Sequence, residues 1–550
     1  MLHMKRATLS RKNFIKLGGL AMAGGFLAAC TSEIEAANAP ENLPTITEEQ
    51  KITATTLPTV TQMEVPTRTQ PSPPLTPTPT ATTATPTVEN IRKLDGEVLT
   101  AGQEQRLSEA ALEFVAGTEN DAIQVARSLG YLKNDGHPAS VCGPLAVAIL
   151  REAGLISRYV DLHDFWLLNP RDRMNVKILE RTFPRDEFMW YQNRISTGEF
   201  DFQAFPFKAG DFIYLYAGDP GSFEHMLTVS RVDEDGRAYA VTNFDTPDGY
   251  VIQEVVLYDP THPGVGKFYD WTNRKNYRYG LTGFGGFDLW RFAKPVLEVG
   301  PHEEGLINAI DEVIAKNGGK WYVLIREITR PNLYAREIRE PVHPASTIKV
   351  PIAMLFFHWL TKKNPQNLQE ALKLGIDGRS YEQLLKAMLV VSEEKATESI
   401  LKALELARED LNKVLTEWGT DSIDVIKRIA SAHDMAILFE GLYGNYLSEE
   451  ARRYILDALI VYTPGDDTRW GAIRKKLPEG YQFFNKRGTI TDDFLAVADW
   501  AIIECPTSLG KKTYILGAFG FQGEKKTHYE SLVKTIEEMS GAFWNYVQGL

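Results

Sequence analysis

A serine and a lysine stand three residues apart in the segment HPASTIKVPIAML, where a long apolar stretch begins. Residues i and i+3 of a helix share a face, so we expect the side chain of Lys349 beside Ser346. A lysine in an apolar, partly dry site loses proton affinity and can accept the proton of a serine hydroxyl. The spacing therefore predicts a nucleophile with its base, while the first turn of a buried helix is the alternative.

Two later segments supply companions for this pair. MLVVSEEKATESIL contains Ser392, and FFNKRGTITDDF contains Lys486 and Gly488 in a stretch typical of a strand. In this order the three segments resemble the Ser-x-x-Lys, Ser-Asp-Asn and Lys-Thr-Gly motifs of class A β-lactamases and penicillin-binding D,D-peptidases. The resemblance covers about residues 300 to 550. It implies an α/β fold in which an antiparallel sheet is flanked by a helical subdomain.

The resemblance also implies a role for each residue. Ser346 is expected to be the acylated nucleophile and Lys349 its activating base. Ser392 is expected to relay a proton to the leaving nitrogen, and Lys486 to bind a substrate carboxylate. The backbone N–H groups of Ser346 and Thr489 are expected to stabilise the oxyanion.

The segments depart from the family pattern in three ways. Glu394 stands where the family has asparagine, and Arg487 where it has threonine or serine. With Gly488 and Thr489, these two residues are expected to line the substrate site. We expect the Glu394 carboxylate within a few Å of Lys349, where it would hold the lysine protonated. The family's Glu-x-x-Leu-Asn loop is missing, so efficient hydrolysis of β-lactams is not expected.

A second candidate nucleophile is Cys142 in HPASVCGPLAVAIL, where a helix is expected to begin. A thiol at a helix N-terminus is favoured as the thiolate, which is the nucleophilic form. His225 starts a predicted strand and is the candidate base. The next predicted strand carries Asn243 and Asp245 on one face, and either could orient the imidazole.

This Cys…His…Asn/Asp order resembles papain-like cysteine peptidases of the bacteriocin-processing type, over about residues 130 to 250. It implies an α+β domain with cysteine peptidase or amidase activity. Helical patterns followed by strand patterns in the region also favour an α+β domain. The alternative is a buried structural cysteine and an unrelated histidine.

The N-terminus has the pattern of an export signal. Five basic residues precede the apolar stretch LGGLAMAGGFLAA, which is too short to span a bilayer as an anchor. The following LAAC resembles a lipobox, which implies lipidation of Cys30. A Thr/Pro-rich segment then predicts an extended tether. We expect a signal at 1–30 and a tether at 31–94.

The chain of 550 residues is too long for one ordinary core. We therefore expect two further domains, a papain-like one at 95–297 and a β-lactamase-like one at 298–550. The net charge of −12 argues against nucleic acid as a partner. The ten histidines form no zinc motif, so neither a metal nor a cofactor is expected.

Together these features predict a lipid-anchored hydrolase of amide bonds on the outer face of the cytoplasmic membrane, with peptidoglycan or a peptide as substrate. One alternative is a lipoprotein that binds or senses peptidoglycan through a catalytically impaired β-lactamase-like domain. Another is a β-lactamase, which the missing loop disfavours.

Overall fold

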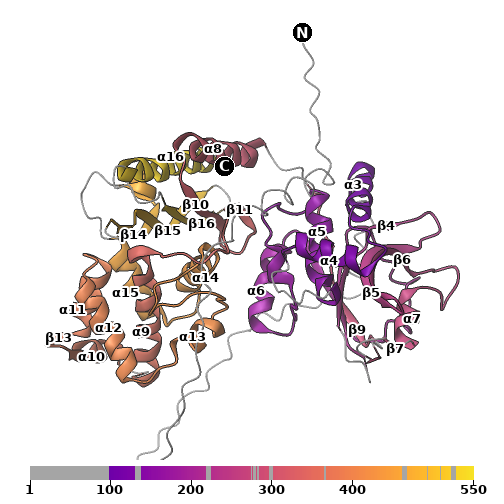
Figure 1. Ribbon diagram of the computed structural model, residues 1–550, viewed down its shortest axis with the longest axis horizontal. Coiled ribbons are helices and arrows are strands. Elements are labelled where there is room, and N and C mark those ends of the chain that lie inside the picture. The colour runs from indigo at the N-terminus through magenta and orange to yellow at the C-terminus, as the bar shows by residue number, and fades with distance from the viewer. Residues whose placement is uncertain are drawn as a thin grey trace, which may run out of the picture. The chain divides into compact units, whose positions relative to one another are not determined.

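The computed structural model (Figure 1) describes residues 98–550 except 131–137, 219–223, 274, 277–279, 282–283, 297–300, 365–366, 461–467, 492–493, 508–509, 522–527 and 550. Cys30 and the predicted tether lie outside the described residues. The described residues all belong to one compact unit. No helix among the described residues has the length and apolarity needed to cross a membrane. The predicted boundary at residue 297 stays a prediction.

The first half of this unit begins with helices and continues with strands, as the sequence pattern predicts, apart from α7, which follows the sixth strand. The helices and short 3₁₀ turns are α3 (Ala101–Leu112), α4 (Glu119–Ser128), η1 (Pro138–Val141), α5 (Cys142–Glu152), η2 (Leu162–Phe165), α6 (Arg173–Thr182) and α7 (Lys267–Asn273). An antiparallel sheet has the order β1 (Phe188–Asn193), β9 (Gly286–Phe292), β2 (Phe212–Tyr216), β3 (His225–Thr228). A second has the order β4 (Arg231–Val232), β5 (Ala238–Thr246), β6 (Gly249–Tyr258), and β7 (Lys275–Asn276) pairs with β8 (Gly280–Leu281).

The second half is built on a five-stranded antiparallel sheet. Its order is β11 (Asn332–Arg336), β10 (Lys320–Glu327), β16 (Gly510–Phe521), β15 (Ala496–Thr507), β14 (Gln482–Ile490). Helices α8 (Pro301–Asn317) and α16 (Tyr529–Gln548) cover one face (Figure 1). The other face packs against a helical region made of η3 (Ala345–Ile348), α9 (Lys349–Lys363), α10 (Leu368–Lys373), the hairpin β12 (Gly375–Ile376) and β13 (Arg379–Ser380), α11 (Tyr381–Leu389), α12 (Glu394–Leu406), α13 (Leu411–Glu417), α14 (Ala432–Tyr443) and α15 (Glu449–Ile460). The turn η4 (Arg469–Lys476) leads into β14.

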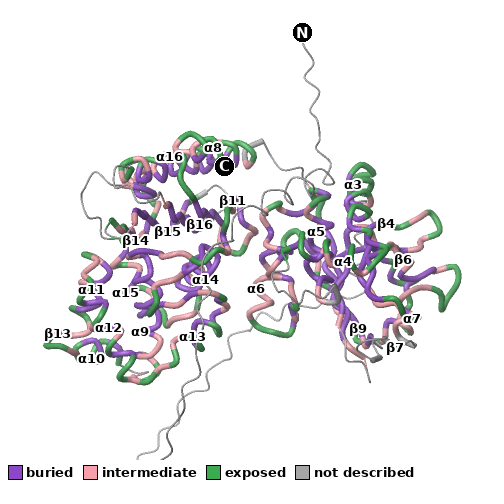
Figure 2. Tube along the Cα trace, viewed as in Figure 1, coloured by how far each residue is buried: buried purple, intermediate pink, exposed green. Residues whose placement is uncertain are grey.

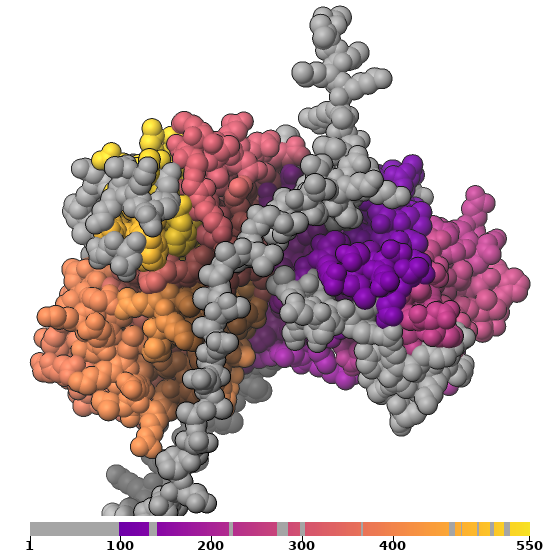
Figure 3. Space-filling model, viewed as in Figure 1, coloured from indigo at the N-terminus to yellow at the C-terminus, as the bar shows by residue number. Residues whose placement is uncertain are grey.

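Alternation along β10 explains this layering. Trp321, Val323 and Ile325 are buried with the residues of α8 and α16, while Tyr322 and Leu324 are buried with the helical region. A strand whose side chains alternate between two covered faces is apolar throughout. Figure 2 accordingly shows the sheet in purple and much of α8 in green. On the surface in Figure 3, the rose atoms of α8 lie above the orange atoms of the helical region.

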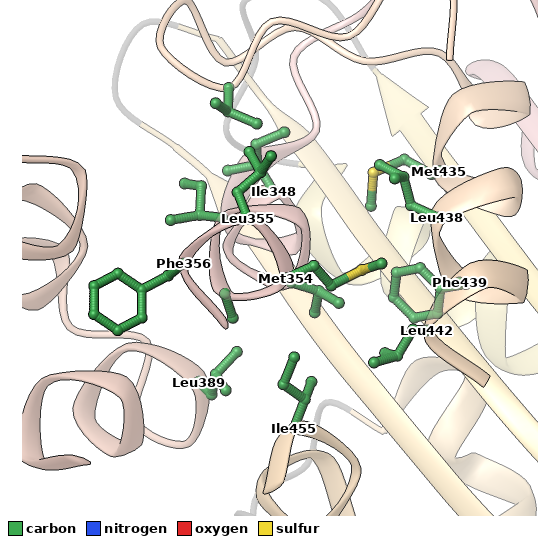
Figure 4. Packing of buried hydrophobic residues seen from close by; sticks show 14 of the residues in the cluster. Ile348, Met354, Leu355, Phe356, Leu389, Met435, Leu438, Phe439, Leu442 and Ile455 are labelled. Carbon is green, nitrogen blue, oxygen red and sulfur yellow. The ribbon is translucent and has the colours of Figure 1, made fainter. Parts of the chain in front are cut away.

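Helix α9 runs through the centre of the helical region, because it is apolar on nearly every side. In Figure 4, Met354 points toward Phe439 and Leu442 of α14, and Phe356 points to the opposite side. All four side chains are completely buried. This packing fixes the first turn of α9, which carries Lys349.

Candidate active site

The segment that carries Ser346 is held in one conformation. Ser346 lies in η3, directly before α9, and its neighbour Ala345 has φ 50°, in the left-handed region. The N–H of Ala345 donates to Nδ1 of His343 at 3.0 Å, and Thr347 Oγ1 donates to the Pro344 carbonyl at 2.6 Å. Such a backbone conformation costs roughly 1–3 kcal/mol and persists only where its surroundings hold it.

Strand β14 passes unusually close to this segment. A Cβ atom on Gly488 would lie 2.6 Å from the Ser346 nitrogen and 2.8 Å from the Ala345 Cβ. Both distances are shorter than van der Waals contact allows, so only glycine fits at position 488. The strand and the short helix therefore meet at the serine.

Lys349 is placed to act as the base for Ser346. Its Nζ atom donates to Ser346 Oγ at 3.2 Å, to Ser392 Oγ at 3.2 Å and to the Ser392 carbonyl at 2.7 Å. Burial is the main cause that lowers the pKa of Lys349 to about 8, and the positive charge of Arg428 acts in the same direction. A substantial fraction of this amine is therefore neutral near pH 8, and a neutral amine can accept the hydroxyl proton.

Ser392 links the two lysines of the site. It has φ 62° in the turn between α11 and α12, and its Oγ also accepts a hydrogen bond from Lys486 Nζ at 2.9 Å. Burial lowers the pKa of Lys486 to about 7, and the charges of Lys349 and Arg487 reinforce the shift. The structure thus brings together Ser346, Lys349, Ser392 and Lys486 as predicted, while their catalytic roles stay predictions.

Glu394 lies beside Lys349, as predicted from the sequence. Its effect on the pKa of Lys349 also depends on Arg428, which the sequence did not reveal. Its Oε2 atom lies 3.1 Å from Lys349 Nζ, and its Oε1 atom accepts a hydrogen bond from Arg428. A carboxylate at this distance favours the charged lysine, whereas burial and Arg428 favour the neutral one. With its pKa lowered to about 8, Lys349 is still mostly protonated at pH 7, so the expectation that Glu394 keeps it protonated stays a prediction, while burial and Arg428 act against it. Arg428 lies outside the three motifs and was not among the residues predicted for the site.

A cavity of about 450 Å³ opens beside Ser346. It is lined by Ser346, Leu389, Val390, Val391, Ser392, Ala458, Thr468, Arg469, Gly471, Arg474, Asn485, Lys486, Arg487, Gly488 and Thr489. The predicted substrate-site residues Arg487, Gly488 and Thr489 are thus in the cavity wall, whereas Glu394, predicted with them, is not among these lining residues. Among these described lining residues there are basic groups and no carboxylate, so the cavity suits a negatively charged ligand.

Arg469 supports the cavity wall from below. Its guanidinium donates to the carbonyls of Gly488 (2.5 Å) and Ala498 (2.7 Å) and to Thr489 Oγ1 (2.6 Å). Beneath the site, Asp499 is completely buried and accepts hydrogen bonds from Asn485 Nδ2 at 2.9 Å and the Trp470 N–H at 3.0 Å. Burial raises the pKa of Asp499 to about 7.

Cys142 begins α5 as the sequence predicts, but the environment of its thiol is different from the prediction. The side chain is buried, and burial raises the pKa of Cys142 to about 11. Backbone hydrogen bonds, the strongest from Met226, act in the opposite direction and are outweighed. The prediction of a stabilised thiolate is therefore wrong, since the loss of hydration exceeds the effect of the helix N-terminus.

His225 lies on the other face of the sheet from Cys142. On β3, Thr228 Oγ1 donates to the Ala146 carbonyl of α5 at 2.8 Å, and Met226 lies against Gly143, so even-numbered residues face α5. Adjacent residues of a strand point to opposite faces. The His225 ring instead hydrogen-bonds Thr242 Oγ1 at 2.7 Å, and burial lowers the pKa of the imidazole to about 3.

The predicted orienting residues lie on the next strand, and alternation along that strand gives their direction. Asn243 and Asp245 lie on β5, on the face opposite to that of Thr242, which is the residue that the imidazole contacts. This arrangement argues against the Cys142–His225 dyad, which stays a prediction, and favours the alternative of a small buried core cysteine.

One group of metal-ligating side chains occurs among the described residues. Ligand atoms of Asp161, Asp164 and His433 lie within 4.8 Å of one another. Arg339 already donates hydrogen bonds to both aspartates and approaches His433 Nε2 at 3.2 Å. The guanidinium supplies the positive charge that a metal would bring, so this group does not fit a metal ion.

Comparison with known proteins agrees with the motifs of the second half. Residues 305–547 match the model of the beta-lactamase enzyme family. A β-lactamase structure from Xanthomonas campestris has 17% identity, a TM-score of 0.36, and coverage of 45% of this chain and 100% of that one. A β-lactamase structure from Burkholderia vietnamiensis has 17% identity, a TM-score of 0.35, and coverage of 45% of this chain and 97% of that one. An ancestral class A β-lactamase has 18% identity, a TM-score of 0.35, and coverage of 44% of this chain and 99% of that one.

No curated protein matches the chain. The family match gives residues 305–547 the β-lactamase-like α/β fold of a serine hydrolase, which confirms the prediction for this part. A papain-like fold for the first half stays without such support.

Proposed function

We propose that the chain is an amide-bond acyltransferase or hydrolase in which Ser346 is acylated by an anionic peptide or β-lactam. The observation that carries the proposal is the contact of Lys349 Nζ with Ser346 Oγ at 3.2 Å beside a basic cavity. A nucleophile, a base of suitable pKa and a charge-complementary cavity are the three parts that acyl transfer needs.

The contacts support a sequence of proton movements. Neutral Lys349 takes the proton of Ser346 Oγ as that oxygen attacks the amide carbonyl carbon. The Ser392 hydroxyl lies between Lys349 and Lys486 at 3.2 and 2.9 Å, so it can pass a proton to the nitrogen when the C–N bond breaks. The product is an ester on Ser346, and Lys486 supplies positive charge for a substrate carboxylate.

Release of the acyl group needs an activated water. The described residues that line the cavity include no carboxylate that could activate this water, and Glu394, outside that lining, is held between Lys349 and Arg428. We therefore expect a long-lived acyl-enzyme. This feature favours a second candidate function, a binding or sensing protein that is acylated once, and it places a β-lactamase below both.

The natural substrate that we propose is a peptide of the cell wall, met at the outer face of the cytoplasmic membrane. The support is the export signal pattern, the LAAC sequence at Cys30 and the Thr/Pro-rich segment 31–94. Fractionation of cells tests the anchor: a Cys30→Ser variant should leave the membrane fraction, and a variant that stays there contradicts lipidation at this residue.

Intact-mass measurement with a fluorescent penicillin tests the reaction. Wild type should gain one acyl adduct and Ser346→Ala none, and an adduct that persists for hours separates sensing from hydrolysis. Digestion of purified peptidoglycan by wild type and Ser346→Ala then tests the wall substrate. Equal adduct formation in both proteins would reject Ser346 as the nucleophile.

A further inference from the structure

A loop outside the three motifs delivers a charge to the serine site. Arg428 has φ 57°, and its guanidinium donates to Glu394 Oε1, while Glu394 Oε2 lies 3.1 Å from Lys349 Nζ. The Glu394 carboxylate is thus shared between a guanidinium on one side and the amine on the other. A carboxylate that contacts two cations stabilises each of them less than it would stabilise one alone. Arg428 therefore influences how strongly Lys349 holds its proton.

The loop is built to hold Arg428 in place. Asp424 and Ile429 exchange backbone hydrogen bonds of 2.9 and 3.0 Å, and the Asp424 carboxylate accepts from the N–H groups of Ile426 and Lys427 at 3.0 and 2.9 Å. Ala430 and Val342 exchange backbone bonds of 2.9 and 3.0 Å, and Val342 lies on the segment that leads to Ser346. The loop and the nucleophile are therefore docked on one another.

Glu394 is fixed from its own side. It is the first residue of α12 and lies two positions after Ser392. The turn that carries the Ser392 hydroxyl therefore also carries the Glu394 carboxylate. Its neighbour Glu393 turns to a different partner, Arg379, at 2.7 Å. The two glutamates at this helix start thus serve two separate arginines, and only Glu394 also contacts Lys349.

We propose that Arg428 is a positioning residue that holds the Glu394 carboxylate and so leaves Lys349 free to act as the base for Ser346. The proposal rests on the function proposed above. It also explains the presence of a glutamate at position 394. Glu394 and Arg428 have opposite charges and opposite effects on Lys349, and together they set the pH range in which Lys349 can act as a base.

Other charged groups near Lys349 also act on its proton. Lys486 on β14 shares the Ser392 hydroxyl and repels the ammonium form of Lys349, and the charge of Arg487 in turn lowers the pKa of Lys486. His343 lies near Arg428, whose charge contributes to lowering the pKa of that imidazole after burial. Among these groups only Glu394 contributes negative charge in direct contact with the amine, so the control of that carboxylate matters most.

Titration of Lys349 itself tests the proposal without any substrate. The probe is heteronuclear NMR of the full chain labelled with ¹³C at lysine Cε, with the Lys349 signal assigned by Lys349→Arg. Arg428→Asn is the main variant, because asparagine tolerates a left-handed backbone and removes the charge. We expect the midpoint of Lys349 to rise by about one pH unit. Acylation at pH 7 should then fall about tenfold.

Three further variants separate the proposal from a merely structural role. Arg428→Lys keeps the charge and should restore at least half of the shift. Arg379→Asn breaks the neighbouring pair with Glu393 and should leave the midpoint unchanged. In a Glu394→Gln background, Arg428→Asn should move the midpoint by less than half as much as in wild type.

Two outcomes would overturn the proposal. One is an unchanged Lys349 midpoint in folded Arg428→Asn, and the other is an equal shift with and without the Glu394 carboxylate. If Ser346 accepts no acyl group in any variant, the proposed function fails, whereas the titration still decides the role of Arg428.

Discussion

Replacement of Lys486 by arginine should change the shape of the pH profile of Ser346 acylation. The reaction needs Lys349 neutral as a base and Lys486 charged as a carboxylate partner. Their pKa values of about 8 and about 7 have the reverse order, so the productive form is always a minority. The two amines share the Ser392 hydroxyl and influence each other. The acidic and alkaline limbs of the pH profile therefore report apparent pKa values of the coupled pair, not of one lysine each. Wild type should therefore show a bell centred near pH 7.5.

The magnitudes follow from these two values. At pH 7.5, about a quarter of Lys349 is neutral and about a quarter of Lys486 is charged, which makes about 6% productive. At pH 9 the productive fraction falls to about 1%, because Lys486 has lost its proton. Arginine stays charged at both values, so the variant should instead gain about fourfold between pH 7.5 and 9. The ratio of the two rates should thus change by about 25-fold.

The assay is stopped-flow acylation by an anionic fluorescent penicillin, with each protein normalised to its own rate at pH 7.5. Normalisation removes any loss from the altered geometry of arginine. Lys316→Arg, on the exposed face of α8, is the control and should keep the bell. An alkaline limb that survives in Lys486→Arg would refute this account, as would a wild-type rate that still rises above pH 8.5.

Three other substitutions or probes test the surroundings of the site. Iodoacetamide should label Cys142 and Cys505 only as fast as the native protein opens, because burial raises their pKa values to about 11 and about 12; fast labelling of native Cys142 at neutral pH would contradict this. Asp211→Asn should lower the free energy of unfolding by roughly 3–5 kcal/mol in denaturant melts, because it leaves the buried Arg291 without a counter-charge. In wild type the two side chains are paired through hydrogen bonds of 2.6 and 2.8 Å. A loss below about 1 kcal/mol would be inconsistent with this account. The raised pKa of Asp499, about 7, contributes stability that is present at low pH and lost as the pH rises through 7. The melting temperature of wild type should therefore fall relative to that of Asp499→Asn between pH 5 and 8. Parallel curves for the two proteins would contradict this.

The serine site was predictable because its chemistry lies in short, local patterns. Ser346 and Lys349 share a helix face through their spacing alone, and Lys486 lies on an apolar strand that alternation reveals. Arg428 was not predictable in this way. Its position depends on a left-handed backbone and on pairing of its loop with Val342, which lies far away in the sequence.

The arrangement around Cys142 was not predictable, because the face that a strand residue takes depends on its register. A sequence shows that His225 starts a strand, but it does not show which face of that strand meets α5. Met226 and Thr228 take that face, and a shift of one residue sends every side chain to the opposite side. The helix-first, strand-later order of this half was predictable because it depends on patterns of many residues rather than on one.

The contact of Gly488 with the nucleophile segment has a consequence for how this site can change by mutation. Any larger residue at 488 would push the Ser346 nitrogen, so that position offers no route to a new substrate. Arg487 and Thr489 lie in the cavity wall without that restriction. Along this strand, variation in specificity is therefore confined to the positions on either side of Gly488, and a library randomised at 487 and 489 should yield far more folded, acylating clones than one randomised at 488.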